Sequence, residues 1–341
     1  MNKIVKKVLG IGLSVALVGG MFAACSGGNG GETNTDAKTW KVGICQLVQH
    51  EALDAATKGF KDELTKRAEA DGNKIEFNEQ NAAGDSATCA TITNGFVADG
   101  VDLIMANATP ALQAASQSTT EIPIVATSVT DFASALEIDS KDWTDKSGIN
   151  VTGTSDLAPL SEQAAMFKDL APEAKTIGIV YCSAEANSVY QAKEVAKELK
   201  ALGLESQEFS AADTNEIASV VQNACDKCDA LYIPTDNTMA SATGTIEPIV
   251  AKAKKVVIAG EEGICKGCGL ATLSISYEAI GRNAGKMAYE ILKDGKNPAE
   301  MDIAVPTKDD VIYKIVPSRA KDLGITAPEG YEELSTEEAA E

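Results

Sequence analysis

The chain has 341 residues, of which 44% are hydrophobic and 5% aromatic, and its formal net charge is −20. Such an acidic protein repels polyanions, so nucleic acid and anionic lipid are disfavoured as its partners. No run of ~18 apolar residues follows the N-terminal segment, so no later segment is expected to cross a membrane. The roughly 300 remaining residues suffice for one large or two medium domains with a buried core.

Residues 1–24 have the pattern of a lipoprotein signal peptide. Three lysines precede the apolar run VLGIGLSVALVGGMF, and small residues lead to Cys25, whose thiol can accept a diacylglycerol. Cleavage would remove the three lysines and change the formal charge from −20 to −23. An uncleaved membrane anchor is the alternative. Residues 25–40 are expected to be a flexible tether. The signal peptide and Cys25 together predict a lipid-anchored, palmitoylated protein on the extracytoplasmic face of the cell membrane.

Short β-branched runs alternate with amphipathic helical patterns from Lys41 onward. The pattern EALDAATKGFKDELTKRAEA, for example, has Leu53, Phe60 and Leu64 on one face of a helix. Such alternation predicts an α/β fold with parallel sheets. We expect strands at residues 41–48, 74–80, 101–107, 123–129, 175–181, 204–210, 229–234 and 255–260.

The alternation breaks at residues 130–155, which contain no clean helical pattern, and then restarts. We therefore expect two similar α/β lobes joined near residues 151–155, with a cleft that opens and closes on several linkers. A second crossing is expected at GLATLSISY, and the strand in DDVIYKIVPS is expected to cross back. The predicted division is a first lobe of residues 41–152 and about 278–308, a second lobe of 153–277 and about 309–325, and a frayed acidic tail of 326–341.

Polar side chains follow the strands of both predicted lobes where each strand ends. Because ligands collect at the carboxyl ends of parallel strands, we expect these side chains to face one cleft. Thr109 before Pro110, and Asn237 before a helical pattern, also fit ordinary helix caps with no ligand. The polar residues in these positions are Gln46, Gln49, His50 and Glu51; Asn107 and Thr109; Thr127, Ser128, Thr130 and Asp131; Ser183, Glu185, Asn187 and Ser188; and Thr235, Asp236 and Asn237.

Two acids stand out among these residues. Glu185 and Asp236 lie among small or apolar residues at strand ends, and a buried lone carboxylate needs a cationic partner. The amino group of a ligand would supply one. A free helix N-terminus at Asn187 or Ser188 would in turn favour a carboxylate. An acid beside a helix N-terminus predicts a receptor for a zwitterion.

The signals for catalysis are weak. His50 is the one histidine of the chain, so no site with several histidine ligands can be built and a Ser-His-Asp triad would have a single candidate base. Neither G-x-S-x-G nor G-x-x-x-x-G-K-[ST] occurs in the sequence. We therefore expect neither an enzyme nor a bound cofactor.

Two C-x-x-C pairs, Cys225 with Cys228 and Cys265 with Cys268, have the spacing of a zinc site. The first pair ends a helix just before a strand, whereas the second pair follows the next strand. We therefore expect the pairs at opposite ends of the sheet. One shared zinc site is accordingly disfavoured against two local disulfides, which are permitted outside the membrane, or free thiols in an oxygen-poor habitat.

Eight segments, in order along the chain, resemble the substrate-binding lipoproteins of ABC transporters related to the tryptophan/tyrosine-type binding proteins. They are VGICQLVQHEALDAATKGFKDEL, NAAGD, ANATPALQAA, IPIVATSVTD, NVTGTSD, YCSAEANSV, ALYIPTDNTMASA and GLATLSISYEAIGRNAGKMA. The resemblance extends from about Lys41 to Ile325. It implies a type I periplasmic-binding-protein fold, in which two Rossmann-like lobes close about a hinge. The C-x-x-C pairs are not part of this family's pattern.

The resemblance also implies a function and a set of ligand-binding residues. It implies a monomer that captures an amino acid, with an aromatic or large apolar one favoured, and delivers it to an ABC permease and its ATPase. A sugar or nucleoside receptor and a ligand-sensing lipoprotein are the alternatives, since one architecture binds many solutes. The implied site residues are Gln46, Thr109 and Thr130 from the first lobe, and Ser183, Glu185, Asn187, Ser188, Asp236 and Asn237 from the second.

Overall fold

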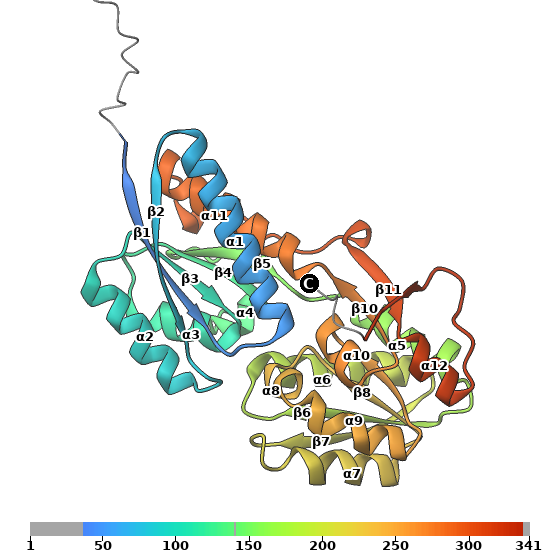
Figure 1. Ribbon diagram of the computed structural model, residues 1–341. Coiled ribbons are helices and arrows are strands. Elements are labelled where there is room, and N and C mark those ends of the chain that lie inside the picture. Colours follow the sequence, from blue (N-terminus) through green and yellow to red (C-terminus); the bar gives the residue numbers. More distant parts are fainter. Residues whose placement is uncertain (1–36, 140, 337–341) are drawn as a thin grey trace, which may run out of the picture. The chain divides into compact units, whose positions relative to one another are not determined.

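The computed structural model describes residues 37–139 and 141–336, so the predicted signal peptide and Cys25 lie outside this part of the chain. Its first elements are β1 (Thr39–Gln46), α1 (Glu51–Ala70), β2 (Lys74–Asn81), α2 (Ser86–Asp99), β3 (Leu103–Asn107), α3 (Thr109–Ser118), β4 (Ile124–Val129), α4 (Phe132–Ala135) and β5 (Val151–Ser155). They form a parallel sheet in the order β2-β1-β3-β4-β5 (Figure 1). Strands β3, β4 and β5 are buried throughout, as expected where helices cover both faces.

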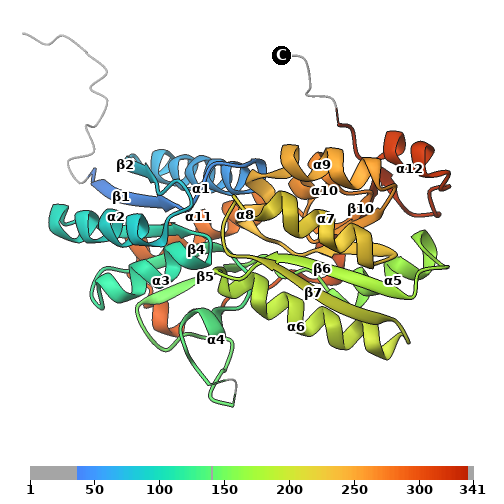
Figure 2. The same cartoon turned by 90° about the horizontal axis from the view of Figure 1, so that it is seen from below.

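The next elements build a second sheet. They are α5 (Leu160–Leu170), β6 (Thr176–Cys182), α6 (Ala186–Ala201), β7 (Glu205–Ala211), α7 (Ile217–Lys227), β8 (Ala230–Ile233), α8 (Asn237–Ser241), α9 (Thr243–Lys252), β9 (Val256–Ala259), α10 (Glu262–Cys268) and β10 (Ala271–Ile275). Apolar side chains of α5 and α6 pack on one face of this sheet, and those of α7, α9 and α10 pack on the other (Figure 2).

The last elements return to both sheets. They are α11 (Tyr277–Asp294), the 3-10 helices η1 (Pro298–Glu300) and η2 (Lys308–Asp310), β11 (Val311–Ile315), α12 (Pro317–Leu323) and β12 (Glu332–Glu333). The second sheet has the order β12-β11-β10-β9-β8-β6-β7, and it is parallel except that β11 runs antiparallel to β10. None of the helices in the described residues is long and apolar enough to span a membrane.

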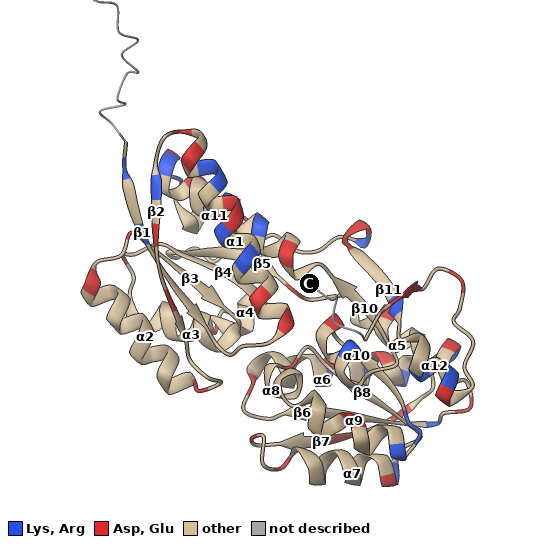
Figure 3. Ribbon diagram, in the orientation of Figure 1, with Lys and Arg blue, Asp and Glu red and all other residues tan. Residues whose placement is uncertain are grey.

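Helix α11 packs along α1 on the first sheet. The approach is close because glycines lie at the crossing: a Cβ on Gly281 would lie 2.1 Å from the carbonyl oxygen of Ala56, and one on Gly59 would lie 2.3 Å from that of Glu278. Both helices contain many charged residues (Figure 3), and Lys58 Nζ lies 3.8 Å from Glu278 Oε1. Residues far apart in the sequence therefore complete one layer.

We use "first lobe" for the elements around the five-stranded sheet together with α11, and "second lobe" for those around the seven-stranded sheet. The chain passes between the lobes after β5, after β10 and between α11 and β11. The first and third connections are tied together, because Ser155 N donates to Ala304 O at 2.8 Å and Thr154 forms a bridge with Ala304. This bundle of connections is the candidate hinge.

All eight predicted strands are present, with ends shifted by at most two residues. Two predicted boundaries differ. The tether was expected to reach residue 40, but β1 begins at Thr39 and Trp40 is buried, where it packs edge-on against Tyr289. The tail was expected to be frayed from residue 326, but β12 pairs with β11 and Leu334 is buried. In both cases an apolar side chain extends the ordered domain further than charge and composition indicate.

Candidate functional site

The two lobes contact each other at the carboxyl ends of their strands. His50 Nε2, at the start of α1, lies 3.2 Å from Asn237 Oδ1, at the start of α8. Gln191 Nε2, on α6, lies 3.5 Å from Thr130 Oγ1, which follows β4. We call the region bounded by these contacts the cleft. Strand ends from both sheets converge here, as expected for a ligand site in a parallel α/β protein.

Eight of the nine predicted ligand-binding residues are buried around the cleft. Ser183 is the exception, since its side chain is exposed and its hydroxyl donates to Ala211 O at 3.3 Å. Ser188 is fully buried on the first turn of α6. The buried residues are Gln46, Thr109, Thr130, Glu185, Asn187, Ser188, Asp236 and Asn237.

Gln46 organises the first-lobe wall. Its Oε1 accepts from Thr57 Oγ1 at 2.6 Å, while its Nε2 donates to Val48 O at 2.9 Å and to Asp54 Oδ1 at 2.6 Å. Both ends of the amide are thus used to hold the turn between β1 and α1. Gln46 shapes this turn and offers a ligand little unsatisfied polarity.

Thr109 differs, because its Oγ1 is buried without a hydrogen-bond partner. It starts α3, whose N-cap Ala108 provides no side-chain acceptor. Ala108 has φ 92°, and Ser128, whose Oγ is also buried without a partner, has φ 56°. Non-glycine residues in this region are strained and cluster where a protein positions groups for function. The first lobe therefore presents hydroxyls and open backbone N–H groups.

The Glu185 carboxylate is saturated by its own lobe. It accepts from Asn187 Nδ2 at 3.1 Å, from Asn237 N and Nδ2 at 3.1 and 2.6 Å, and from Thr238 N and Oγ1 at 2.8 and 2.7 Å. A carboxylate has about four acceptor positions, so none remains for a ligand. The expectation that burial of Glu185 requires a cation is wrong in this structure, because the N-terminus of α8 supplies the donors.

Asp236 is held in a similar way. Its oxygens accept from Cys182 N at 2.6 Å and from Met239 N at 2.8 Å. Burial raises the pKa of Asp236 to about 7, and the nearby charge of Glu185 adds to this. Asp236 is therefore a helix cap that also ties α8 to the end of β6, and it too is buried without a cation.

Asn187 is the second-lobe counterpart of Thr109. Its Nδ2 donates to Glu185 Oε2 and to Thr235 O, but its Oδ1 is buried without a partner. Helix α6, on which it lies, has no side-chain cap, since its N-cap Glu185 is bound to α8 instead. The second lobe therefore offers an open acceptor beside an open helix N-terminus.

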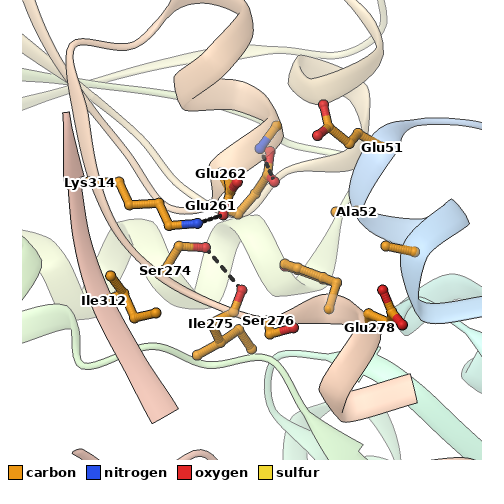
Figure 4. Close-up of a pocket in the computed structure, with 13 residues that line it drawn as sticks. Glu51, Ala52, Glu261, Glu262, Ser274, Ile275, Ser276, Glu278, Ile312 and Lys314 are labelled. Atoms are coloured by element: carbon orange, nitrogen blue, oxygen red, sulfur yellow. Dashed lines mark hydrogen bonds and ion pairs between the residues drawn. The ribbon is translucent and has the colours of Figure 1, made fainter. Parts of the chain in front are cut away.

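Several cavities lie where the lobes meet, and two of them lie beside the strand ends. One, of about 240 Å³, is lined by Leu47, Val48 and Pro110 of the first lobe and by Glu185 and Asn237 of the second, among others. The other, of about 260 Å³, lies between the N-termini of α1 and α10 (Figure 4), and its lining includes Glu51, Ala52, Glu261, Glu262, Ser274, Ile275, Ser276, Glu278, Ile312 and Lys314. Two of its acidic side chains already have partners within the protein, because Glu262 forms an ion pair with Lys314 and Glu261 caps α10. Both cavities are thus lined by polar and apolar groups together.

Sequence reasoning missed two buried residues near the hinge. Asp156 follows β5, and its carboxylate accepts from Thr130 Oγ1 at 3.1 Å and from Tyr277 OH at 2.9 Å. Gln191 lies in the middle of α6 and bonds both N and O of Thr235. A period-3.6 reading would have placed Gln191 on the buried face of α6, which is a detectable signal for a polar core residue.

The C-x-x-C cysteines are free thiols and all four are buried. Cys228 caps the C-terminal end of α7, two residues before β8, and the second pair lies on α10 after β9, but both pairs belong to the same apolar cluster on one face of the sheet. Within the described ranges, no group of three or more His, Cys, Asp or Glu residues is placed to hold a metal ion. The thiols therefore act as small apolar core groups.

Comparison with known proteins gives a consistent result. The family model described as ABC transporter substrate binding protein matches residues 41–338. The tyrosine-binding protein of Clostridioides difficile (strain R20291) is 34% identical over 341 residues, which is 98% of each chain. A conserved domain protein of Vibrio cholerae has 32% identity and a TM-score of 0.79, over 86% of this chain and 99% of the other.

Two further solved structures differ in whether a ligand is bound. An ABC domain from Streptococcus pneumonia, solved in complex with L-Trp, has a TM-score of 0.79 at 36% identity, over 85% of this chain and 96% of the other. A substrate binding protein with adhesive properties from Clostridium difficile, solved ligand-free and open, has a TM-score of 0.66 at the same 36% identity, over 87% and 100%. The present chain thus superimposes better on the ligand-bound structure than on the open one.

Proposed function

Because the chain belongs to the family of ABC transporter substrate-binding proteins, we propose that its cleft captures an amino acid, with an aromatic or large apolar one favoured. The printed ligands of its relatives, tyrosine and L-Trp, support this class. A permease and its ATPase would then receive the amino acid. The observation that carries the proposal is the set of buried, unpartnered polar atoms on both sides of the cleft.

The ligand's carboxylate is assigned to the N-terminus of α3. This end has no side-chain cap, and Thr109 Oγ1 is free to donate there. Open N–H groups and the helix dipole together favour an anion. Ser128 Oγ, at the end of the neighbouring strand β4, adds a second free hydroxyl. Thr109 therefore leads the first-lobe contacts, while Gln46 supports them indirectly through its turn.

The second lobe completes the site through Asn187 Oδ1 and the first turn of α6, where Ser188 is also buried. Glu185, Asp236 and Asn237 hold this wall in place through their mutual contacts. Ser183 lies at the solvent-exposed rim. Across the cavity from this wall, Leu47 and Val48 of the first lobe provide apolar lining that suits an apolar ligand side chain.

Closure about the hinge is the proposed mechanism. A ligand that bridges Thr109 in the first lobe and Asn187 in the second makes its full set of contacts only when the lobes are together. Its differential affinity for the two states then sets their populations. The direct contacts between the lobes, such as His50 with Asn237, stabilise the closed state and limit re-entry of water.

The remaining assignments concern the cell. The family acts outside the cytoplasm, and we assign the N-terminal segment as a lipoprotein signal peptide with a lipid on Cys25, followed by a tether that ends before Thr39. The protein would act as a monomer held at the membrane. Mass spectrometry of the membrane-extracted protein tests this: a diacylated Cys25 at the N-terminus is expected, and an intact residue 1–24 segment would contradict it.

A thermal-shift screen of the chain from residue 25 onward tests the ligand class. We expect L-tryptophan, L-tyrosine or branched amino acids to stabilise the protein by about 2.7 kcal/mol at a hundredfold excess over Kd. Common sugars and nucleosides serve as comparison ligands. A shift with one of these and none with any amino acid would overturn the proposal.

A further inference from the structure

Two cysteines of the first lobe, on different elements, contact each other. Cys45 is the last residue but one of β1, and Cys89 is the fourth residue of α2. Both are fully buried in the same apolar cluster, and their thiols form a side-chain hydrogen bond. They are more than forty residues apart in the sequence, so it is the fold that brings them together.

Backbone hydrogen bonds fix the path of α2 along β1 (Figure 2). Before α2, Gly84 N donates to Leu47 O at 2.8 Å, just past the end of β1. After α2, Asp102 N donates to Lys41 O at 2.8 Å, near the start of β1. The start of the helix therefore lies at the end of the strand, and the two elements run in opposite directions.

Side-chain packing shows the same register. A Cβ on Gly43 would lie 2.6 Å from the ring of Phe96, so the strand and the helix touch there. Cys45 lies two residues after Gly43 on the same face of β1, and Cys89 lies two turns before Phe96 on the same face of α2. Because the elements run in opposite directions, this register places Cys89 beside Cys45. Backbone and core packing thus support the thiol contact independently.

The other cysteines of the described residues have different surroundings. Cys182 Sγ donates to Ala212 O at 3.7 Å, and Cys268 Sγ donates to Ile264 O at 3.4 Å. The two members of each C-x-x-C pair are only three residues apart in the sequence. A bond within such a pair would constrain the unfolded chain little, because the stabilisation by a disulfide grows with the length of the loop that it closes.

We propose that Cys45 and Cys89 are joined by a disulfide in the exported protein, as a covalent cross-link between β1 and α2. The family acts outside the cytoplasm, where disulfides form and persist. The residues just after β1 and those at the start of α2 line the first-lobe side of the 240 Å³ cavity. The cross-link would hold these two segments of the cleft wall together.

The contact between the thiols suits formation of this bond by thiol–disulfide exchange. The hydrogen bond with Cys45 lowers the pKa of the Cys89 thiol, against the opposing effects of burial and the charge of Asp85. The same contact and burial raise the pKa of Cys45. Cys89 is therefore the nucleophile of the pair, because the thiolate is the attacking form.

The oxidant is a protein or small-molecule disulfide outside the membrane. The Cys89 thiolate attacks one of its sulfurs, the S–S bond of the oxidant breaks, and a mixed disulfide with Cys89 forms. Cys45 then loses its proton, and its thiolate attacks the Cys89 sulfur and releases the second sulfur of the oxidant. The Cys45–Cys89 bond is formed, and the two electrons and two protons leave with the oxidant as two thiols.

Burial determines when this reaction occurs. Both thiols have 0% exposure, so a bulky disulfide has no access to them in the folded lobe and the exchange takes place while the lobe is assembling. Both cysteines precede the whole second lobe in the chain, so they are exported early. Once formed, the buried bond is shielded from reductants, which makes it a permanent cross-link.

Mass spectrometry of the exported full chain, purified without reductant, tests the proposal. The protein is unfolded in the presence of iodoacetamide and digested with trypsin, and we expect the peptides 42–58 and 75–141 to be linked. The link should survive dithiothreitol applied to the folded protein and disappear on reduction in denaturant. Complete alkylation of Cys45 and Cys89, or a link from either to another cysteine, overturns the proposal.

The melting temperature gives a second test. Wild type refolded with glutathione disulfide should melt about 4–8 °C above wild type refolded with dithiothreitol, because the cross-link closes a long loop. The difference should vanish in C45A/C89A and persist in C225A/C228A, the matched control that removes another buried pair. Equal melting temperatures of the two wild-type preparations, or a difference that persists in C45A/C89A, overturn the proposal. Neither measurement uses a ligand, so the result is independent of the proposed function.

Discussion

The two walls of the cleft contain similar polar residues but differ in whether those residues already have hydrogen-bond partners within the protein. In the first lobe, Thr109 Oγ1 and Ser128 Oγ are buried and unpartnered. In the second lobe, the Glu185 carboxylate is surrounded by five donors from its own lobe. A carboxylate whose acceptor positions are all occupied by donors of its own lobe is a structural part of the wall. A buried hydroxyl with no hydrogen-bond partner is the better candidate for a ligand contact.

The lobes also differ in backbone strain. Ala108 and Ser128, with φ values of 92° and 56°, both lie at strand ends of the first lobe beside the cleft. The corresponding turns of the second lobe, at Asp236 after β8 and at Glu261 after β9, have ordinary extended φ values of −137° and −147°. We interpret the first-lobe wall as the part that is positioned for the ligand at a conformational cost, and the second-lobe wall as a saturated hydrogen-bonded scaffold.

Substitution of Glu185 gives the largest expected effect. Glu185→Ala leaves the buried N–H groups of Asn237 and Thr238 without their acceptor, so we expect a loss of about 3 kcal/mol or more in the free energy of unfolding. Urea denaturation measures it. Ser183→Ala, an exposed neighbour, is the matched control and should be neutral. Undiminished stability of E185A with weaker ligand binding would instead make Glu185 a direct ligand contact.

The buried acids predict an unusual pH dependence of stability. The pKa values of Asp236 and Glu261 are raised by burial to about 7 and that of Asp156 to about 6. The folded state therefore binds more protons than the unfolded state between about pH 4 and 7, and stability decreases as the pH rises through this window. We expect the free energy of unfolding of the ligand-free protein to be lower at pH 8 than at pH 5, with the lowered pKa of buried His50 opposing part of this change.

Asp236→Asn is the control for that experiment, because it removes one titrating group and keeps an acceptor for Met239 N. Its stability should depend less on pH than that of the wild type. The exposed Asp62, Asp71 and Asp85 have lowered pKa values and titrate below this window. An increase in wild-type stability from pH 5 to pH 8 would contradict the prediction.

Thr109→Val should produce the opposite pattern from Glu185→Ala. The Thr109 hydroxyl has no partner in the protein, so its loss should leave the free energy of unfolding unchanged or slightly higher. Affinity for the amino acid should fall about tenfold, or ~1.4 kcal/mol. Thr93→Val is the matched control, since this buried hydroxyl donates to Cys89 O. It should cost stability and leave affinity unchanged, and the reverse result for the pair would refute the comparison between the walls.

The smallest effect is expected from the contact at the rim. Lys266 Nζ of the second lobe lies 3.2 Å from Glu51 Oε2 of the first, with side-chain exposures of 26% and 55%. Such partly exposed pairs contribute ~0.5 kcal/mol or less and are screened by salt. Lys266→Met should therefore change Kd by less than about threefold, and only at low ionic strength. A larger, salt-independent change would mean that closure depends on this pair.

The periodic features of the fold could be predicted from the sequence. Alternating patterns located the strands around both sheets within two residues, because burial of one face is recorded locally. The antiparallel direction of β11 and the docking of Leu334 were not predicted. Both depend on which distant strand the chain meets after the third connection, and no local pattern records that.

The sequence predicts candidate site residues at the strand ends, and their hydrogen-bond partners required the structure. Asn187 and Thr109 were named as site residues, but so was Glu185, whose donors come from α8, more than fifty residues away. Asp156 was missed, because an aspartate shortly before a helix looks like an ordinary cap. The sequence shows which groups are polar, whereas their satisfaction depends on tertiary partners.

The packing of α11 on α1 has a consequence for how the protein forms after export. The first lobe is incomplete until Gly281 reaches Ala56 and Glu278 reaches Gly59, and strands β6 to β10 of the second sheet are synthesised in between. The second sheet is in turn incomplete until β11, near the end of the chain, pairs with β10. The first lobe cannot finish folding before α11 is available and the second cannot before β11 is available, so we expect late assembly and prolonged exposure of apolar surface while the chain is incomplete.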